Sequence, residues 1–480
     1  MNPAPVSERI NTWLRTSITL KLIVMGILIL LLLIPAAMIG DLIRERERLR
    51  DGAIAEVSQR WGAAQSVTGP VLAIPYTVVQ TVGEGDSQRT VTTTQYAYFL
   101  PDDLQVTGRL DPQLRHRGLH EVVVYTSNLN VEGHFPQPDF SEWDIEPDLI
   151  RWDEATVLVG LPDLRSINES ISMDWNTAKA SFEPGVAPHG IFASGITARV
   201  PLQANGPPQY DFTFALDLNG SQSMYVAPLG RETNVRLEAP WADPSFDGAF
   251  LPDDRQVTPE GFSADWRVLH LNRSYPQRWR GTNIRFALTA EDAYTLPDPY
   301  ASPQVNASAG SPTNALFGVR LLLPVDQYRK TTRASKYGLL IITLTFLAFF
   351  FAEIRRRVRV HPFQYLLVGL ALCLFYALLL SFSEHLSFLW SYLLTAGATL
   401  VLITGYSKAA LKSGTLAGIT GGLLVFLYGF VFILLQLQDY ALLIGSIGLF
   451  IILALVMYAS RQIDWYAPYK KAEPHPEGVG

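Results

Sequence analysis

Six uncharged apolar runs constrain the fold of this 480-residue chain more than any other feature. The first, Leu22–Ile39, has 18 residues and would extend about 27 Å as a helix, close to the roughly 30 Å hydrocarbon core of a bilayer. Basic residues precede it, as in a secretory signal peptide, but the run is longer than an h-region and lacks an A-x-A cleavage site. We therefore predict a retained transmembrane helix. Five further runs follow, at residues 337–352, 362–383, 386–407, 413–438 and 440–460.

Residues 40–336 separate the first run from the others and show mainly a period of two. In Tyr210–Leu218 every even-numbered residue is apolar, and Asn234–Glu238 alternates in the same way. Such alternation is typical of antiparallel strands with one buried face. Cys373 is the only cysteine and lies in an apolar run, so this segment can form no internal disulfide. The predicted fold is a six-helix transmembrane α block with a large, mainly antiparallel β extracytoplasmic domain inserted between helices 1 and 2.

The segment also contains a short internal repeat. Phe99–Thr107 recurs as Phe250–Thr258 with eight of nine residues identical, whereas the flanking residues do not match. We favour a reused local turn, and leave open whether the β domain is one unit or two related halves.

Basic residues in the short loops give an orientation. They follow the second, fourth and sixth runs, whereas the loops after the third and fifth runs carry none. By the positive-inside rule, residues 1–21 and the tail 461–480 are predicted to be cytoplasmic and residues 40–336 to be outside. The 337–352 run is the shortest, so we expect Lys336 and Glu353 at its ends to snorkel. The net charge of −6 gives no reason to expect nucleic acid as a partner.

Several short motifs occur in a characteristic order along the chain. In the predicted β domain and its approach they are Trp61, Gly62, Gln65, Gly69 and Pro70, then Glu121–Tyr125 and Pro244–Gly248. In the membrane block they include Gln364 and Tyr365 after His361, Glu384 with His385, and Asp439 with Tyr440. This ordered set resembles the CreD family of bacterial inner-membrane proteins over about residues 14–466.

The resemblance implies a Gram-negative inner membrane, with residues 40–336 in the periplasm. It also implies a role in cell-envelope integrity and envelope stress, including colicin tolerance. The family brings no catalytic residues to this chain. Its pattern has Glu before Asp439, whereas Gln438 stands here.

Enzyme motifs are scarce in the sequence. H-E-x-x-H, G-x-S-x-G, P-loop and G-x-G-x-x-G patterns are all missing. His116 and His120 are four apart, but they lie where a loop enters a strand, and we interpret them as surface histidines. We expect no catalytic, cofactor or metal site, and no cofactor.

Two groups of residues in the membrane block are candidate sites. Gly414, Gly418 and Gly422 recur every four residues, a spacing that favours close helix packing over a substrate passage. Glu384, His385 and Asp439 are predicted at the outer membrane surface, where loop solubility explains them most simply. The sharper hypothesis is that these three residues dock the β domain or bind an envelope ligand.

The leading functional interpretation is a non-enzymatic envelope factor, whose β domain binds an envelope protein, cell-wall or lipid partner while six helices hold it in the lipid bilayer. One alternative is a transporter or channel for small solutes or lipids, although ion and substrate paths usually need charges within the spans. The other is an envelope enzyme of unrecognised chemistry.

Overall fold

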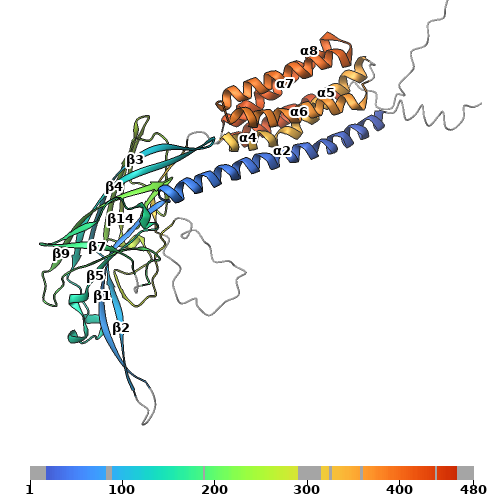
Figure 1. Cartoon of the computed structure of the whole chain (residues 1–480). Coiled ribbons are helices and arrows are strands. Elements are labelled where there is room, and N and C mark those ends of the chain that lie inside the picture. The colour runs from blue at the N-terminus through green and yellow to red at the C-terminus, as the bar shows by residue number, and fades with distance from the viewer. Residues whose placement is uncertain are drawn as a thin grey trace, which may run out of the picture. The chain divides into compact units, whose positions relative to one another are not determined.

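The computed structural model describes residues 18–82, 89–186, 190–289, 315–323, 327–356, 360–437 and 440–461. The chain divides into two compact units, which are described separately (Figure 1). The helical unit comprises residues 1–49 and 325–480, and the β domain comprises residues 50–324.

In the part of the chain that the structure describes, six helices are long and apolar enough to cross a membrane, as predicted. The helices of the described residues are α2 (Ile18–Trp61), α4 (Gln327–Lys336), α5 (Gly338–Arg356), α6 (Pro362–Ser383), α7 (Phe388–Leu411), α8 (Gly414–Gln436) and α9 (Ala441–Ser460). The first helix continues well past the apolar run through the charged residues Arg44–Asp51, whose opposite charges at a spacing of three favour a helix.

The strands of the β domain all lie in sequence between α2 and α4. They are β1 (Gln65–Val82), β2 (Arg89–Phe99), β3 (Asp103–Arg117), β4 (His120–Pro136), β5 (Thr156–Gly160), β6 (Ser172–Trp175), β7 (Ala178–Pro184), β8 (Gly195–Arg199), β9 (Gln209–Ser221), β10 (Ser223–Val226), β11 (Glu232–Ala239), β12 (Pro244–Gly248), β13 (Asp254–Thr258), β14 (Gly261–Leu269), β15 (Arg278–Arg280) and β16 (Phe317–Leu321).

These strands form one 16-stranded hydrogen-bonded system. Its main path runs β12-β16-β10-β1-β5-β8-β7-β6-β9-β4-β3-β11-β14-β13, with β2 attached to β1 and β15 attached to β2. The pairs β1 with β10 and β3 with β11 are parallel, and the other described pairs are antiparallel. The mainly antiparallel domain is therefore confirmed.

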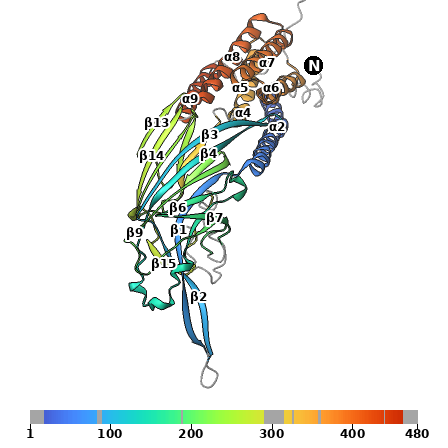
Figure 2. The same cartoon turned by 60° about the vertical axis from the view of Figure 1, so that its left-hand side comes forward.

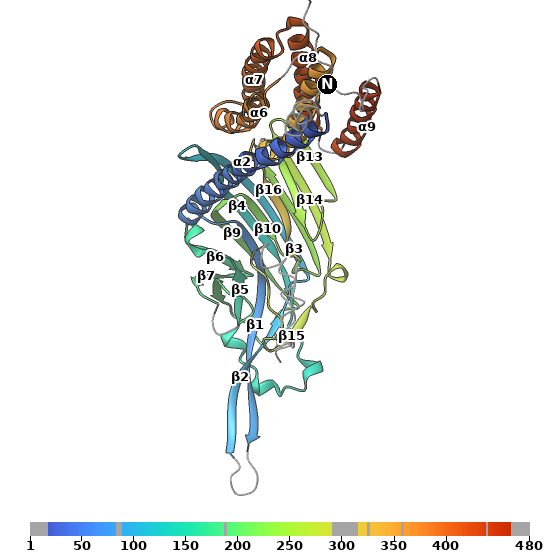
Figure 3. The same ribbon diagram turned by 90° about the vertical axis from the view of Figure 1, so that its right-hand side faces the viewer.

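Alternating side chains explain the core of the β domain. Tyr210, Phe212, Phe214, Leu216 and Leu218 of β9 are buried on one face, as their period of two predicts. They join a single apolar cluster to which most of the strands contribute. One end of the paired strands β1 and β2 extends beyond the other strands (Figures 2 and 3).

The repeated nine-residue segment is a shared entry into a strand. In its first copy Asp102 N donates to His134 O at 3.0 Å, and β3 follows; in its second copy Asp253 N donates to Asp265 O at 2.9 Å, and β13 follows. In each copy, this backbone hydrogen bond therefore joins the turn to the second strand of the hairpin that follows it, which is β4 for the first copy and β14 for the second. This arrangement agrees with a reused local turn.

The predicted glycine stripe does not pack against another helix in the described part of the chain. A Cβ on Gly414, Gly418 or Gly422 would meet nothing within 4 Å. The close approaches occur elsewhere, because a Cβ on Gly369 would meet Leu32 of α2 and Phe346 of α5, and one on Gly421 would meet Thr404 of α7. Helix packing through Gly414, Gly418 and Gly422 stays a prediction, since the four-residue spacing identifies a small-residue face but not which helix meets it.

Replacing Gly369 with leucine should therefore destabilise the helical unit, whereas replacing Gly418 with leucine should not. Overpacking at Gly369 should cost about 1–3 kcal/mol, and loss of an exposed glycine should improve helix propensity by up to about 1 kcal/mol. The measurement is thermal stability of each full-length variant in detergent. Equal losses in the two variants would contradict this assignment of faces.

Arg333 of α4 contacts the end of α8. Its Nη2 donates to Leu434 O and Leu437 O, each at 3.3 Å. A guanidinium is favourable at the negative end of a helix dipole, because the last carbonyls have no intrahelical donors.

Candidate functional site: a polar groove on the β domain

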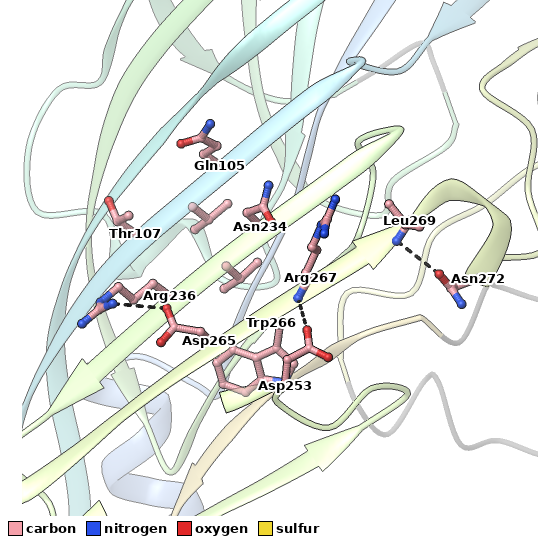
Figure 4. Close-up of a pocket in the computed structure, with 12 residues that line it drawn as sticks. Gln105, Thr107, Asn234, Arg236, Asp253, Asp265, Trp266, Arg267, Leu269 and Asn272 are labelled. Atoms are coloured by element: carbon pink, nitrogen blue, oxygen red, sulfur yellow. Dashed lines mark hydrogen bonds and ion pairs between the residues drawn. The ribbon is translucent and has the colours of Figure 1, made fainter. Parts of the chain in front are cut away.

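A groove of about 590 Å³ lies on the polar face of β3, β11 and β14 (Figure 4). The strand register sets two rows of side chains across it. Asn234 pairs with Gln105 on one side and with Arg267 on the other, and Arg236 pairs with Thr107 and Asp265 in the same way. The register thus brings together residues that are far apart in the sequence.

The residues between these polar positions point into the core. Val106, Val235 and Trp266 are all buried, at 2% exposure or less. The Trp266 ring lies 5.9 Å from the ring of Phe246 and 5.7 Å from that of Phe317, between centroids. The floor of the groove is therefore fixed by an aromatic cluster beneath it, and this packing holds the polar side chains in place.

The charges of the groove are paired. Arg236 Nη1 lies 3.4 Å from Asp265 Oδ1, and Arg267 Nε lies 2.7 Å from Glu232 Oε1. Asp253 Oδ2 accepts a hydrogen bond of 2.8 Å from Arg267 N. The guanidinium of Arg267 holds the pKa of Glu232 below its usual range, because it donates to the ionised carboxylate.

The groove can therefore bind a ligand through hydrogen bonds. Two arginines and two aspartates line it, so their formal charges cancel. Gln105, Asn234 and Thr107 add neutral donors and acceptors. The chemistry suits a polar, extended partner better than an apolar one.

A wider polar face continues from the groove onto β4 and β9. Thr107 pairs with Asn130, and Gln105 pairs with Glu132, which in turn stands opposite Thr213 of β9. These positions alternate with buried residues along each strand, so their side chains lie on the same, outer face of the sheet. A partner larger than the groove could extend across it.

The residues predicted at the outer membrane surface have different surroundings. Glu384 ends α6, its side chain is 11% exposed, and its Oε1 lies 3.7 Å from Arg46 Nε of α2. His385 is exposed. Asp439 lies outside the described residues. The structure thus gives Glu384 a partner within the helical unit, whereas its predicted docking or ligand role stays a prediction.

The histidine pair forms no metal cluster in the described residues. His116 Nε2 lies 3.4 Å from Glu121 Oε1 across the β3–β4 hairpin, and both side chains are largely exposed. Among the residues that the structure describes, no three His, Cys, Asp or Glu side chains gather where they could hold a metal ion.

Sequence reasoning missed the groove as a site. Asn234–Glu238 was recognised as an alternating strand, but nothing in it indicates that β3 lies alongside. The available signal was the set of exposed amide and charged residues on successive strands, and the strand order was needed to join them.

Comparison with known proteins decides the family. A family model described as "Inner membrane protein CreD" matches residues 17–466. The chain belongs to the CreD family. Inner membrane protein CreD of Escherichia coli K12 is 32% identical over 441 residues, which cover 92% of each chain. The CreD relationship confirms the family predicted from the motifs.

Two solved structures have only a weak likeness to this chain. An M1 zinc metallopeptidase from Deinococcus radiodurans has 9% identity and a TM-score of 0.19, covering 80% of this chain and 96% of its own. A mutant of that enzyme has 8% identity and a TM-score of 0.18 over 35% and 38% of the two chains. At such TM-scores the likeness carries no argument about a CreD-family protein.

The first CreD motif forms the junction between α2 and β1. Trp61 Nε1 donates to Tyr125 O at 3.2 Å, and the Arg115 guanidinium lies 4.8 Å from the Trp61 ring centroid. Gly62 has φ of +148°, and a Cβ there would lie 2.5 Å from Asn219 O. These residues therefore seat the end of α2 against β4 and β9.

Other CreD motif residues lie at the start of β1, at the start of α6 and just before α9. Gln65 Nε2 donates to Ala63 O at 3.1 Å, and a Cβ on Gly69, which precedes Pro70, would lie 3.0 Å from Val159 Cα. Gln364 Oε1 accepts from His361 N at 3.0 Å in the first turn of α6. Tyr365, the next residue, bonds to Glu353, and Tyr440 is 63% exposed before α9.

Proposed function

We propose that this protein contributes to the integrity of the cell envelope by binding an envelope partner through the β-domain groove. Membership of a family of inner membrane proteins supports a place in that membrane. The observation that carries the proposal is the groove itself, in which paired charges and the amide side chains of Gln105 and Asn234 lie over a buried aromatic floor. The role proposed is binding, not catalysis.

The orientation supports the same function. Basic residues in the loops after α5, α7 and α9 favour a cytoplasmic location for those loops, and therefore a periplasmic β domain with both chain ends inside. A domain so placed would meet periplasmic proteins and cell-wall material. Loss of such binding would weaken the envelope and alter its tolerance of colicins.

The test is photo-crosslinking in living cells from a probe at Asn234, in the centre of the groove. We expect a discrete adduct that is lost when Gln105 and Arg267 are both replaced by alanine, since each hydrogen bond removed should cost about 0.5–1.5 kcal/mol of binding. The matched control is a probe at Glu169, which is exposed on the same domain and does not line the groove.

Two results would count against the proposed function. One is an adduct of equal yield from the probe at Glu169, which would show that partner capture does not depend on the groove. The other is an unchanged adduct in the alanine variant, which would mean that the groove residues do not hold the partner.

A further inference from the structure

A buried carboxylate lies in the helical unit, near the end of α5. The Glu353 side chain is 3% exposed, and its Oε1 lies 2.7 Å from Lys21 Nζ of α2. Val360 N donates to the same oxygen at 3.2 Å, and Tyr365 Oη donates to Oε2 at 3.2 Å. Glu353 was expected to snorkel outward from a short span, and this is corrected, because it points into the helices and meets an ammonium group there.

An apolar cavity of about 180 Å³ adjoins this ion pair. Its lining includes Lys21, Glu353 and Tyr365, and its apolar walls are formed mainly by side chains of α2 with Phe350 of α5. The contributing residues of α2 are Leu20, Val24, Met25 and Leu28. Sites that enclose whole small molecules measure roughly 300–1,000 Å³, so this cavity suits part of a larger ligand.

The position of the cavity identifies that ligand as an amphiphile. Lys21 immediately precedes the uncharged run of α2, and Arg355 and Arg356 follow Glu353 at the end of α5, so the charged end of the cavity lies where apolar spans give way to polar residues. Phospholipid headgroups occupy that level of a bilayer. The apolar walls then extend toward the level of the acyl chains.

The charges of Lys21 and Glu353 indicate which phospholipid headgroup would fit beside the cavity. A carboxylate and an ammonium side by side complement a zwitterion, whose phosphate would face Lys21 and whose cation would face Glu353. The three described hydrogen bonds leave room at Glu353 for one more donor, since a carboxylate accepts about four. A cation that retains N–H groups can supply it, whereas a quaternary ammonium cannot.

We propose that this cavity binds a zwitterionic phospholipid with a primary ammonium headgroup, of the phosphatidylethanolamine type. The ammonium donates to Glu353, the phosphate accepts from Lys21, and an acyl segment lies against Val24, Met25 and Phe350. The binding is independent of the β-domain groove.

The test is native mass spectrometry of the full-length protein in detergent, titrated separately with phosphatidylethanolamine, phosphatidylcholine and phosphatidylglycerol. We expect about tenfold greater retention of phosphatidylethanolamine than of the other two, because only its headgroup supplies both a cationic N–H donor and a phosphate. Equal retention of the three lipids would overturn the proposal, and the ion pair would then serve only to link α2 to α5.

A pair of variants tests the location. Val24→Phe should fill the apolar part of the cavity and remove the preference while leaving the Lys21–Glu353 pair intact. Ile27→Phe is the matched control, since Ile27 is 57% exposed and does not line the cavity. A preference that survives Val24→Phe would overturn the assignment to this cavity. If Val24→Phe fails to fold, the headgroup comparison on the unaltered protein still decides the proposal.

Discussion

Replacing Gly62 with alanine should destabilise the β domain strongly. The backbone φ of +148° is one that side-chain-bearing residues rarely adopt, and the strain should cost about 1–3 kcal/mol. The new Cβ would also lie 2.5 Å from Asn219 O and 2.9 Å from Asn219 C. These are backbone atoms of β9, so they cannot move aside cheaply, and overpacking should add about 1–3 kcal/mol.

Gly118→Ala is the control for this prediction. Gly118 has φ of +61°, but a Cβ there would meet nothing within 4 Å. The measurement is the urea concentration at which the β domain of the full-length protein becomes sensitive to protease. Gly62→Ala should lower that midpoint much more than Gly118→Ala, and similar midpoints would show that the close approach to Asn219 has no energetic weight.

Replacing Lys21 with methionine should destabilise the helical unit by about 3–5 kcal/mol, toward the lower end because Lys21 is itself 34% exposed. The substitution leaves the Glu353 carboxylate buried without its cation, and the hydrogen bonds from Tyr365 and Val360 compensate only in part. Adding Glu353→Gln to Lys21→Met should restore much of the loss, because the unpaired charge is then removed as well.

The control lies further along the same helix. Arg46→Met removes the ion pair with Glu384, in which the Arg46 side chain is 43% exposed, and should cost at most about 1 kcal/mol. Thermal stability in detergent measures all three variants. If Lys21→Met proves as mild as Arg46→Met, the buried carboxylate does not depend on Lys21.

The sequence predicted those features that depend on local patterns. The six apolar helices follow from uncharged runs, and β9 follows from the alternation in Tyr210–Leu218. The helical course of α2 beyond the apolar run followed from its charge spacing. Each of these signals is contained within a single segment.

The features that the sequence did not predict join distant segments. Lys21 and Glu353 are 332 positions apart, so Glu353 read alone was assigned to a snorkelling end. Gln105 and Asn234 share a row only because β3 and β11 pair in parallel, and no short turn connects them. The inward face of α8 likewise depends on which neighbours surround it, and the glycine spacing does not contain that information.

Thiol labelling can test the proposed position of the polar binding face on the periplasmic side of the inner membrane. Cys373 is the lone cysteine and is buried, so Cys373→Ser provides a background in which single cysteines replace Gln105, in the groove, and Lys412, after α7. A membrane-impermeant maleimide is applied to intact spheroplasts and, separately, to lysed spheroplasts. We expect labelling of Gln105→Cys in intact spheroplasts and of Lys412→Cys only after lysis. The reverse pattern, or labelling of both positions before lysis, would contradict it.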